Sequence, residues 1–294
     1  MVKKNTILVT GGAGFVGTNL IKLLLNKTNY KILSLDNYSS GSKLNHIKSS
    51  RLKYIKGKTS KINSLIKNPS RIHSAFHFGE FARIYQSFIK MNECIDSNSV
   101  GSNSVFNFCL KNKIKLIYSA TSASLGNKGH DKNLSPYAFS KSKNLELLEN
   151  LKKWFNFKYE VIYFYNVYGP YQISKGQMST VIGIFEDHFK KRKPLPVVRP
   201  GTQTRRFTHI DDTVNICYLA WKKNLCRHYS IANKKSYSLI EVAKMFKSKI
   251  KYLPKRPGER YASALIDKNL SNKMYHHFGK INLQAYINNF IKNN

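Results

Sequence analysis

The 294-residue chain has few acidic residues, with 15 Asp plus Glu against 50 Lys plus Arg and a formal net charge of +35. So few carboxylates make an oxygen-rich metal cage or a catalytic pair of carboxylates hard to build. The only cysteines are Cys94, Cys109, Cys217 and Cys226, and their positions lack the spacing of metal ligands. We therefore expect no metal site, and reduced thiols as in a cytoplasmic protein.

Long apolar runs are also missing, since none reaches the roughly 18 residues that span a bilayer. The N-terminal residues lead directly into the first predicted strand, so we expect no targeting segment, no membrane partner and a cytoplasmic location.

The basic excess should attract anions of any kind, nucleic acid included. Its lysines are spread along the whole chain, however, and the sequence has no zinc finger, basic tail or aromatic nucleic-acid motif. The composition therefore favours a basic solvated surface over specific nucleic-acid binding. A non-catalytic protein that binds a nucleotide or RNA is the alternative from a different class, and the charge is its only support.

The N-terminal segment predicts a dinucleotide-binding unit. Residues 7–10 read as a short buried strand, and a glycine turn and an apolar helical run follow. Gly11 allows the tight turn, Gly14 lets the backbone approach a pyrophosphate, and Gly17 lets the helix pack against the strand. The helix N-terminus would present its N–H groups to the phosphates.

An acidic residue follows in the expected place. The second predicted strand, residues 31–35, ends at Asp36, about twenty residues after the last glycine of the turn. A carboxylate there can bind the ribose hydroxyls and would repel a 2′-phosphate, which favours NAD over NADP.

The later pattern predicts an α/β fold built on a Rossmann-type doubly wound parallel sheet with a smaller mixed α/β C-terminal substrate lobe. The first half alternates apolar strands and helices, and the second half has shorter elements. Further strands are predicted at 53–57, 74–78, 114–118, 161–165, 207–210, 229–232 and 250–253, and helices at 93–112, 135–155, 177–191 and from Ser238. We expect an NAD-binding domain over 1–169 and a smaller second lobe over 170–294, with an interleaved boundary.

A tyrosine and a lysine on the 135–155 helix predict the catalytic centre. Tyr137 and Lys141 are four residues apart near an N-terminus capped by Ser135, so they share one face. A free tyrosine titrates near pH 10, and use as a base near pH 7 requires stabilising the phenolate by roughly 4 kcal/mol. A neighbouring ammonium and the helix N-terminus favour that phenolate. The spacing is common by chance, but here it follows a strand that ends at Thr121, a hydroxyl at the ligand-binding edge of the sheet.

Together these motifs resemble the extended short-chain dehydrogenase/reductases, in particular the NAD-dependent nucleotide-sugar epimerase/dehydratase family typified by UDP-galactose 4-epimerase. The resemblance covers almost the whole chain. The segments that carry it are 10–17, 36–37, 77–79, Asn98 with Gly101, 121–126, 135–141, 166–170, 205–212 and 256–259.

The resemblance implies roles for individual residues. Tyr137 would be the general base, Lys141 its activator, and Thr121 a hydrogen-bond partner of the sugar 4-hydroxyl. The residues implied to hold NAD are Gly11, Gly14, Phe15, Val16, Gly17, Asp36, Asn37, Phe78, Gly79, Asn98 and Lys141.

The substrate implied by the resemblance is a nucleotide-diphosphate sugar, which makes the lobe over 170–294 the nucleotide-sugar-binding lobe. Asn166, Arg205 and Arg256 would bind its diphosphate, a task that suits forked guanidinium groups. Ser263 lies near a place where a bulky residue excludes N-acetylated sugars in 4-epimerases, so a serine would leave room for a 2-acetamido group.

The implied activity is that of an NAD-dependent 4-epimerase. It would act by transient oxidation at C4 of a UDP-hexose or UDP-N-acetylhexosamine, without net consumption of NAD, and supply sugars for surface polysaccharide. Relatives usually form homodimers through helices around 92–112 and 138–156, which pair as a four-helix bundle, and we expect the same here.

Three departures from the family pattern matter. Dehydratases carry Asp-Glu after the threonine, whereas this chain has Ser122 and Ala123, so a 4,6-dehydratase is the least expected reaction. The acid that holds the adenine amino group is replaced by Lys58, which predicts looser NAD binding or binding through backbone alone. Arg205 lacks a neighbouring carboxylate, because Arg206 follows it. A 4-keto-sugar reductase and a UDP-uronate decarboxylase are the alternatives on the same scaffold.

Overall fold

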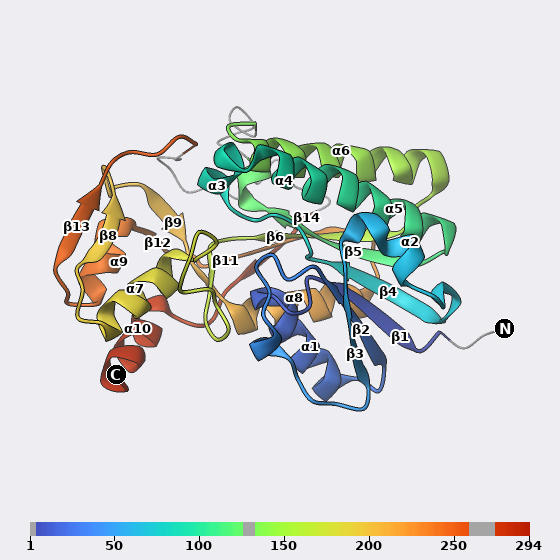
Figure 1. Ribbon diagram of the computed structural model, residues 1–294, viewed down its shortest axis with the longest axis horizontal. Helices are drawn as coiled ribbons and strands as arrows, with labels where there is room; N and C mark the ends of the chain where they lie inside the picture. The colour runs from blue at the N-terminus through green and yellow to red at the C-terminus, as the bar shows by residue number, and fades with distance from the viewer. Residues whose placement is uncertain (1–3, 126–132, 259–273) are drawn as a thin grey trace.

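The computed structural model describes residues 4–125, 133–258 and 274–294. At its centre lies an eight-stranded sheet in the order β14-β11-β6-β5-β4-β1-β2-β3, and every neighbouring pair runs parallel (Figure 1). This architecture confirms the predicted doubly wound α/β fold. The strands are β1 (Thr6–Thr10), β2 (Lys31–Asp36), β3 (Leu52–Lys56), β4 (Ile72–His77), β5 (Lys115–Thr121), β6 (Tyr159–Phe164), β11 (His228–Ala232) and β14 (Met274–Phe278).

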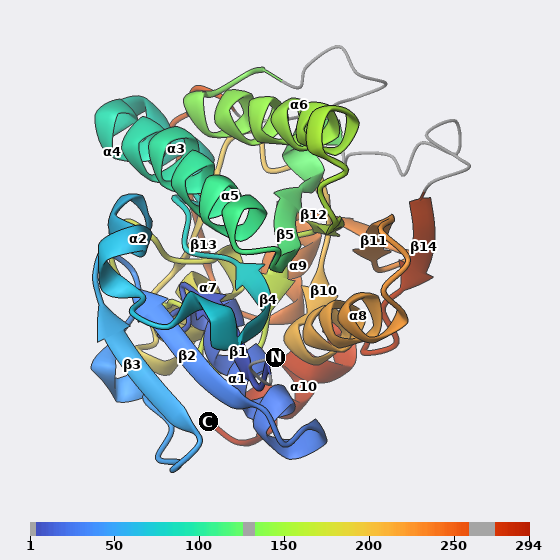
Figure 2. The ribbon, with the colours of Figure 1, turned by 90° about the vertical axis from the view of Figure 1, so that its right-hand side faces the viewer.

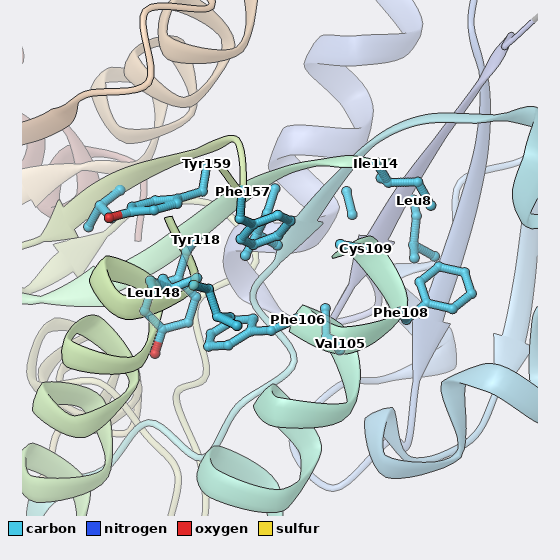
Figure 3. Packing of buried hydrophobic residues seen from close by; sticks show 14 of the residues in the cluster. Leu8, Val105, Phe106, Phe108, Cys109, Ile114, Tyr118, Leu148, Phe157 and Tyr159 are labelled. Carbon is cyan, nitrogen blue, oxygen red and sulfur yellow. The ribbon is translucent and has the colours of Figure 1, made fainter. Parts of the chain in front are cut away.

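Helices cover both faces of the sheet. α1 (Phe15–Lys27) and α8 (Ile210–Lys223) pack together on one face, and α2 (Ile62–Leu65), α5 (Ser102–Lys111) and α6 (Pro136–Phe155) lie on the other (Figures 1 and 2). Successive strand residues point to opposite faces. Ile7 and Leu8 of β1 accordingly enter different core clusters, and both are fully buried. Figure 3 shows the cluster around Leu8.

The long helical pattern at 93–112 forms three successive segments. They are α4 (Met91–Ile95), a π-helical turn η4 (Asp96–Gly101) and α5, and α3 (Ile84–Ile89) precedes them. π-Helical turns within helices are frequent at functional sites. The neighbouring helix α6 begins as predicted, with Pro136 in its first turn and the Ser135 hydroxyl accepting a hydrogen bond from the Ala138 N–H.

A second lobe (left in Figure 1) has its own apolar core around Phe185, Phe246 and Ile287. Its elements are α7 (Val181–Lys190), β8 (Leu195–Val198), β9 (Thr204–Arg206), β12 (Ser236–Ser238), α9 (Leu239–Met245), β13 (Ile250–Leu253) and α10 (Leu283–Lys292). Two short strands, β7 (Val167–Tyr168) and β10 (Thr208–His209), pair with each other. The remaining short helical turns are η1 (Lys43–Asn45), η2 (Thr59–Lys61), η3 (Pro69–Arg71) and η5 (Ser122–Leu125).

The C-terminal half contributes to both lobes. β11 pairs with β6, β14 pairs with β11, and α8 packs on the main sheet, although all three follow residue 170. β14 was not predicted from the sequence. The division into 1–169 and 170–294 stays a prediction about folding units. Along the described chain, no helix is both long and apolar enough to cross a membrane.

Candidate active site

The glycines of the turn after β1 differ in how strongly packing within the protein requires them. A Cβ on Gly17 would lie 2.1 Å from the Gly11 carbonyl oxygen, and one on Gly11 would lie 2.8 Å from the Gly79 nitrogen, so packing within the protein requires both glycines. Gly11 also has a φ of +71°. A Cβ on Gly14 would meet only the Gly11 oxygen, at 3.2 Å, a close contact but a milder one than at Gly11 or Gly17, so packing constrains Gly14 less than the other two.

The space in front of Gly14 suits a pyrophosphate. Gly14 is the N-cap of α1 and provides no side-chain cap, and the first turn of α1 has no acidic residue. Backbone N–H groups and the positive end of the helix dipole therefore face outward there. The residues present fit a dinucleotide at this turn.

Asp36 braces the same turn. Its carboxylate accepts hydrogen bonds from the Ala13 N–H at 2.9 Å and the Tyr38 N–H at 2.8 Å, and only 6% of the residue is exposed. Burial raises the pKa of Asp36, and the two backbone hydrogen bonds oppose that rise. The predicted contact with ribose hydroxyls stays a prediction, and the structure adds a second task for this carboxylate.

A cleft of about 520 Å³ opens between the two lobes at the C-terminal ends of the strands. Tyr137 and Thr121 line it, and the Thr121 hydroxyl acts to lower the pKa of Tyr137. Phe15 and Val16 of the α1 N-terminus lie at the same cleft. Its volume falls within the range of small-molecule sites.

Arginines give the cleft its charge. Arg83, Arg205 and Arg256 line it, and no described lining residue is a carboxylate. Arg256 stacks over the Tyr85 ring at 4.9 Å, and Arg83 donates to the Met178 carbonyl oxygen from Nε at 2.9 Å. This arrangement suits an anionic ligand such as a diphosphate.

Lys141 lies beneath the cleft in a buried ion pair that was not predicted from the sequence. Its ammonium donates to the carboxylate of Glu80 and to the Ser119 carbonyl oxygen, at 2.5 Å for the latter. The side chains of Lys141 and Glu80 are 4% and 2% exposed. Glu80 directly follows Gly79, and in a chain so poor in acids its position at a strand end was an available signal.

The pair continues into a chain of hydrogen bonds that fixes a histidine tautomer. The Ser102 hydroxyl donates to Glu80 Oε1 at 2.8 Å, because a carboxylate only accepts. His77 Nε2, 2.9 Å from Ser102 Oγ, is therefore the donor to Ser102. His77 Nδ1 then accepts from the Thr10 hydroxyl at 2.7 Å, and Thr10 Oγ1 in turn accepts from the Phe78 and Gly79 N–H groups.

Burial dominates the titration of this region. The pKa of Tyr137 is raised to about 12, chiefly by burial and also by Glu80, while the Thr121 hydroxyl and the Arg83 guanidinium oppose the rise. Burial also lowers the pKa of Lys141, and Glu80 opposes that fall. The sequence predicted an ammonium that stabilises the Tyr137 phenolate, whereas in the structure a carboxylate offsets that ammonium.

Other predicted cofactor residues occupy varied places. The Asn98 side chain is fully buried, accepts from the Phe81 N–H at 2.6 Å and donates to the Phe81 carbonyl oxygen at 3.0 Å. Asn37 is exposed after β2, and its side chain accepts from the Ser39 N–H. Lys58 forms an exposed ion pair with Asp96 at 2.9 Å.

The predicted substrate residues lie on the second lobe and its border. Asn166 lines the cleft with a φ of +24°, and its Nδ2 donates to the Arg206 carbonyl oxygen at 3.2 Å. Arg206 turns away toward the carbonyl oxygens of Asn233 and Lys234. Ser263 lies outside the described residues. Where the chain is described, no cluster of three or more His, Cys, Asp or Glu could hold a metal ion.

Comparisons with known proteins agree with this geometry. The model of the NAD dependent epimerase/dehydratase family matches residues 7–232. A Methanocaldococcus jannaschii protein named "Putative UDP-glucose 4-epimerase" is 28% identical in an alignment of 281 residues that covers 92% of this chain and 88% of that relative. The ADP-L-glycero-D-manno-heptose-6-epimerase of Brachyspira hyodysenteriae is also 28% identical, over 82% of this chain and 80% of that relative.

A solved structure supports the fold. The UDP-glucose 4-epimerase of Thermotoga maritima, solved with UDP-glucose, superposes with a TM-score of 0.84 at 22% identity and covers 98% of this chain and 97% of that one. The family match, the relatives and the glycine turn agree, and NAD is the cofactor. The chain therefore belongs to the NAD-dependent epimerase/dehydratase family.

Proposed function

We propose that this protein is a nucleotide-sugar 4-epimerase. One observation carries the proposal: Thr121 and Tyr137 line the same cleft as Arg205 and Arg256. A proton-transfer group and a pair of anion-binding groups thus face a single ligand-sized space. The family and the relatives support the coarser statement that the substrate is a nucleotide sugar.

The side chains of the cleft would have separate roles in substrate binding and proton transfer. Arg205, Arg256 and Asn166 would bind the diphosphate and so orient the sugar toward Tyr137. The Tyr137 hydroxyl would take the proton of the sugar hydroxyl and later return it, with Thr121 holding the hydroxyl in place. When bound at the glycine turn, NAD supplies a reversible hydride acceptor.

The lining of the cleft favours epimerisation over dehydration. Loss of water from a sugar needs an acid and a base beside the leaving hydroxyl. Ser122 and Ala123 follow Thr121, and no carboxylate lines the described part of the cleft. The two relatives are named for epimerisation of different substrates, and C4 is proposed here from the resemblance of the Thr121 and Tyr137 motifs to those of the 4-epimerases.

We also propose that two copies pair through α3–α6. Several large apolar side chains on these helices are exposed, although the surface is otherwise rich in lysine. They are Phe88, Ile89, Met91, Val100, Phe139, Trp154 and Phe155. An apolar patch of this kind fits the predicted four-helix bundle. Light scattering coupled to gel filtration would measure the mass in solution.

NMR would test the activity directly. Purified protein would be incubated with catalytic NAD and a panel of UDP- and dTDP-sugars. Appearance of a C4 epimer without net consumption of NAD, lost in Tyr137→Phe, would support the proposal. Stoichiometric use of reduced cofactor would indicate a reductase, and release of CO2 a uronate decarboxylase.

A further inference from the structure

The Lys141 ammonium has little freedom in this fold. It carries three N–H donors, of which one is directed to Glu80 Oε2 and a second to the Ser119 carbonyl oxygen. Its nitrogen also lies 4.7 Å from the centre of the Tyr118 ring. Two hydrogen bonds and the face of an aromatic ring therefore fix the position of the ammonium.

The carboxylate that holds Lys141 is itself held from several directions. Glu80 Oε1 accepts from Ser102 at 2.8 Å, from Tyr118 at 3.0 Å and from Asn144 at 3.2 Å. With the Lys141 ammonium at Oε2, four donors therefore hold the Glu80 carboxylate in one orientation beside Lys141.

We propose that Glu80 is a positioning residue of the active site. It fixes the position of the Lys141 ammonium and offsets its charge, so that the Tyr137 hydroxyl keeps its proton while the cleft is empty. This inference rests on the proposed function, since it concerns the same proton-transfer group.

The surroundings of Tyr137 define what a substitution should change. Its charged neighbours are Glu80, whose effect raises the pKa of Tyr137, and Arg83, whose effect lowers it. The Cys94 thiol also faces Tyr137 and Lys141, and burial raises its own pKa to about 11, so it is neutral near pH 7. Lys141 and His77 face Glu80 from α6 and β4, and His77 is neutral there because burial lowers its pKa to about 4.

Glu80→Gln removes the charge at nearly constant shape and tests the proposal. The protein would be labelled with 13C-tyrosine, and the Tyr137 signal assigned with Tyr137→Phe. In the wild type the signal should not titrate below pH 10, whereas in Glu80→Gln its pKa should fall by at least about one unit. Glu80→Asp should reverse most of that fall, since it restores the charge.

Glu146→Gln is the matched control. Glu146 forms an exposed ion pair with Lys143 on the same helix, with the two side chains 60% and 54% exposed, so its loss should leave the Tyr137 signal unchanged. The acidic limb of the pH–rate profile should move with the NMR value in Glu80→Gln alone.

Two results would overturn the inference. One is a Tyr137 signal that titrates alike in the wild type and in Glu80→Gln, which would leave Glu80 a purely structural ion pair. The other is a pKa of Tyr137 in the wild type that lies below that of free tyrosine. This result would contradict the inference even if Glu80→Gln does not fold. The titration needs no turnover, so it separates this inference from a failure of the proposed epimerase activity.

Discussion

His77 should make the protein lose stability at mildly acidic pH. The residue is fully buried, and both ring nitrogens are engaged, Nε2 as donor to Ser102 and Nδ1 as acceptor from Thr10. A proton added at Nδ1 would face the Thr10 hydroxyl, whose oxygen already accepts two backbone N–H groups. The fold therefore holds the neutral form of His77.

The sign and size of the effect follow from linkage. Burial lowers the pKa of His77 from 6.5 to about 4 in the folded protein, so the unfolded chain takes up the proton first as the pH falls. The stability tied to the neutral ring is fully present above pH 6.5 and is lost between there and about pH 4. A shift of this size corresponds to about 3 kcal/mol of unfolding free energy.

Chemical unfolding at a series of pH values would measure this loss. We would compare the wild type with His77→Gln, following circular dichroism in guanidinium chloride from pH 7.5 to 4.5. Other titrating groups are common to both proteins, so the difference between the two curves isolates His77. Below pH 6 the wild-type free energy should fall more steeply, by about 1.4 kcal/mol per pH unit for one proton.

Parallel curves for the wild type and His77→Gln would refute the reasoning, because they would mean that a proton enters the folded protein at His77 without cost. His46→Gln serves as the control, since His46 is exposed beside Tyr38 and Tyr54 and its replacement leaves His77 in place. We expect it to keep the steeper wild-type dependence.

Three further predictions concern the glycine turn, Arg256 in the cleft, and Ser263. Gly14→Ala should fold with nearly the wild-type melting temperature but lose at least about tenfold in NAD affinity by titration calorimetry, whereas Gly17→Ala should lower the melting temperature because its Cβ would collide with the Gly11 oxygen. Arg256→Gln should raise KM for the nucleotide sugar by roughly 10- to 100-fold with little change in kcat, as expected for uniform binding of a diphosphate. Ser263→Tyr should reduce turnover of a UDP-N-acetylhexosamine more than that of a UDP-hexose, and equal losses would remove the proposed size filter.

The sequence predicted the main sheet well because its strands carry strong local signals. Strands such as β1 and β6 are buried on both faces and read as continuous apolar runs, and α6 carries its cap and its proline within four residues. β14 gave no such signal, since Met274–Phe278 contains two histidines and joins the sheet only by pairing with β11. A strand that depends on a distant partner cannot be predicted from its own residues.

The same distinction between local and long-range signals separates the site residues that were predicted from those that were missed. The glycine turn, Thr121, Tyr137 and Lys141 are each defined by spacing within one segment, and the sequence was sufficient to nominate them. Glu80 reaches Lys141 only because β4 and β5 are adjacent in the sheet and α6 packs over them, a contact across 61 residues. Arg83 likewise enters the cleft from the loop after β4.

This long-range contact changes the energetics that the spacing of Tyr137 and Lys141 implied. From the sequence, a base near pH 7 needed roughly 4 kcal/mol, with a free ammonium supplying part. In the fold the pKa of Tyr137 is about 12, so forming the phenolate near pH 7 costs about 7 kcal/mol. Since Glu80 already offsets Lys141, most of that cost has to be met by groups that arrive in the cleft. Tyr137 is therefore expected to exchange its proton only in the filled site. In the open cleft it keeps the proton, so that no reactive phenolate is exposed to water.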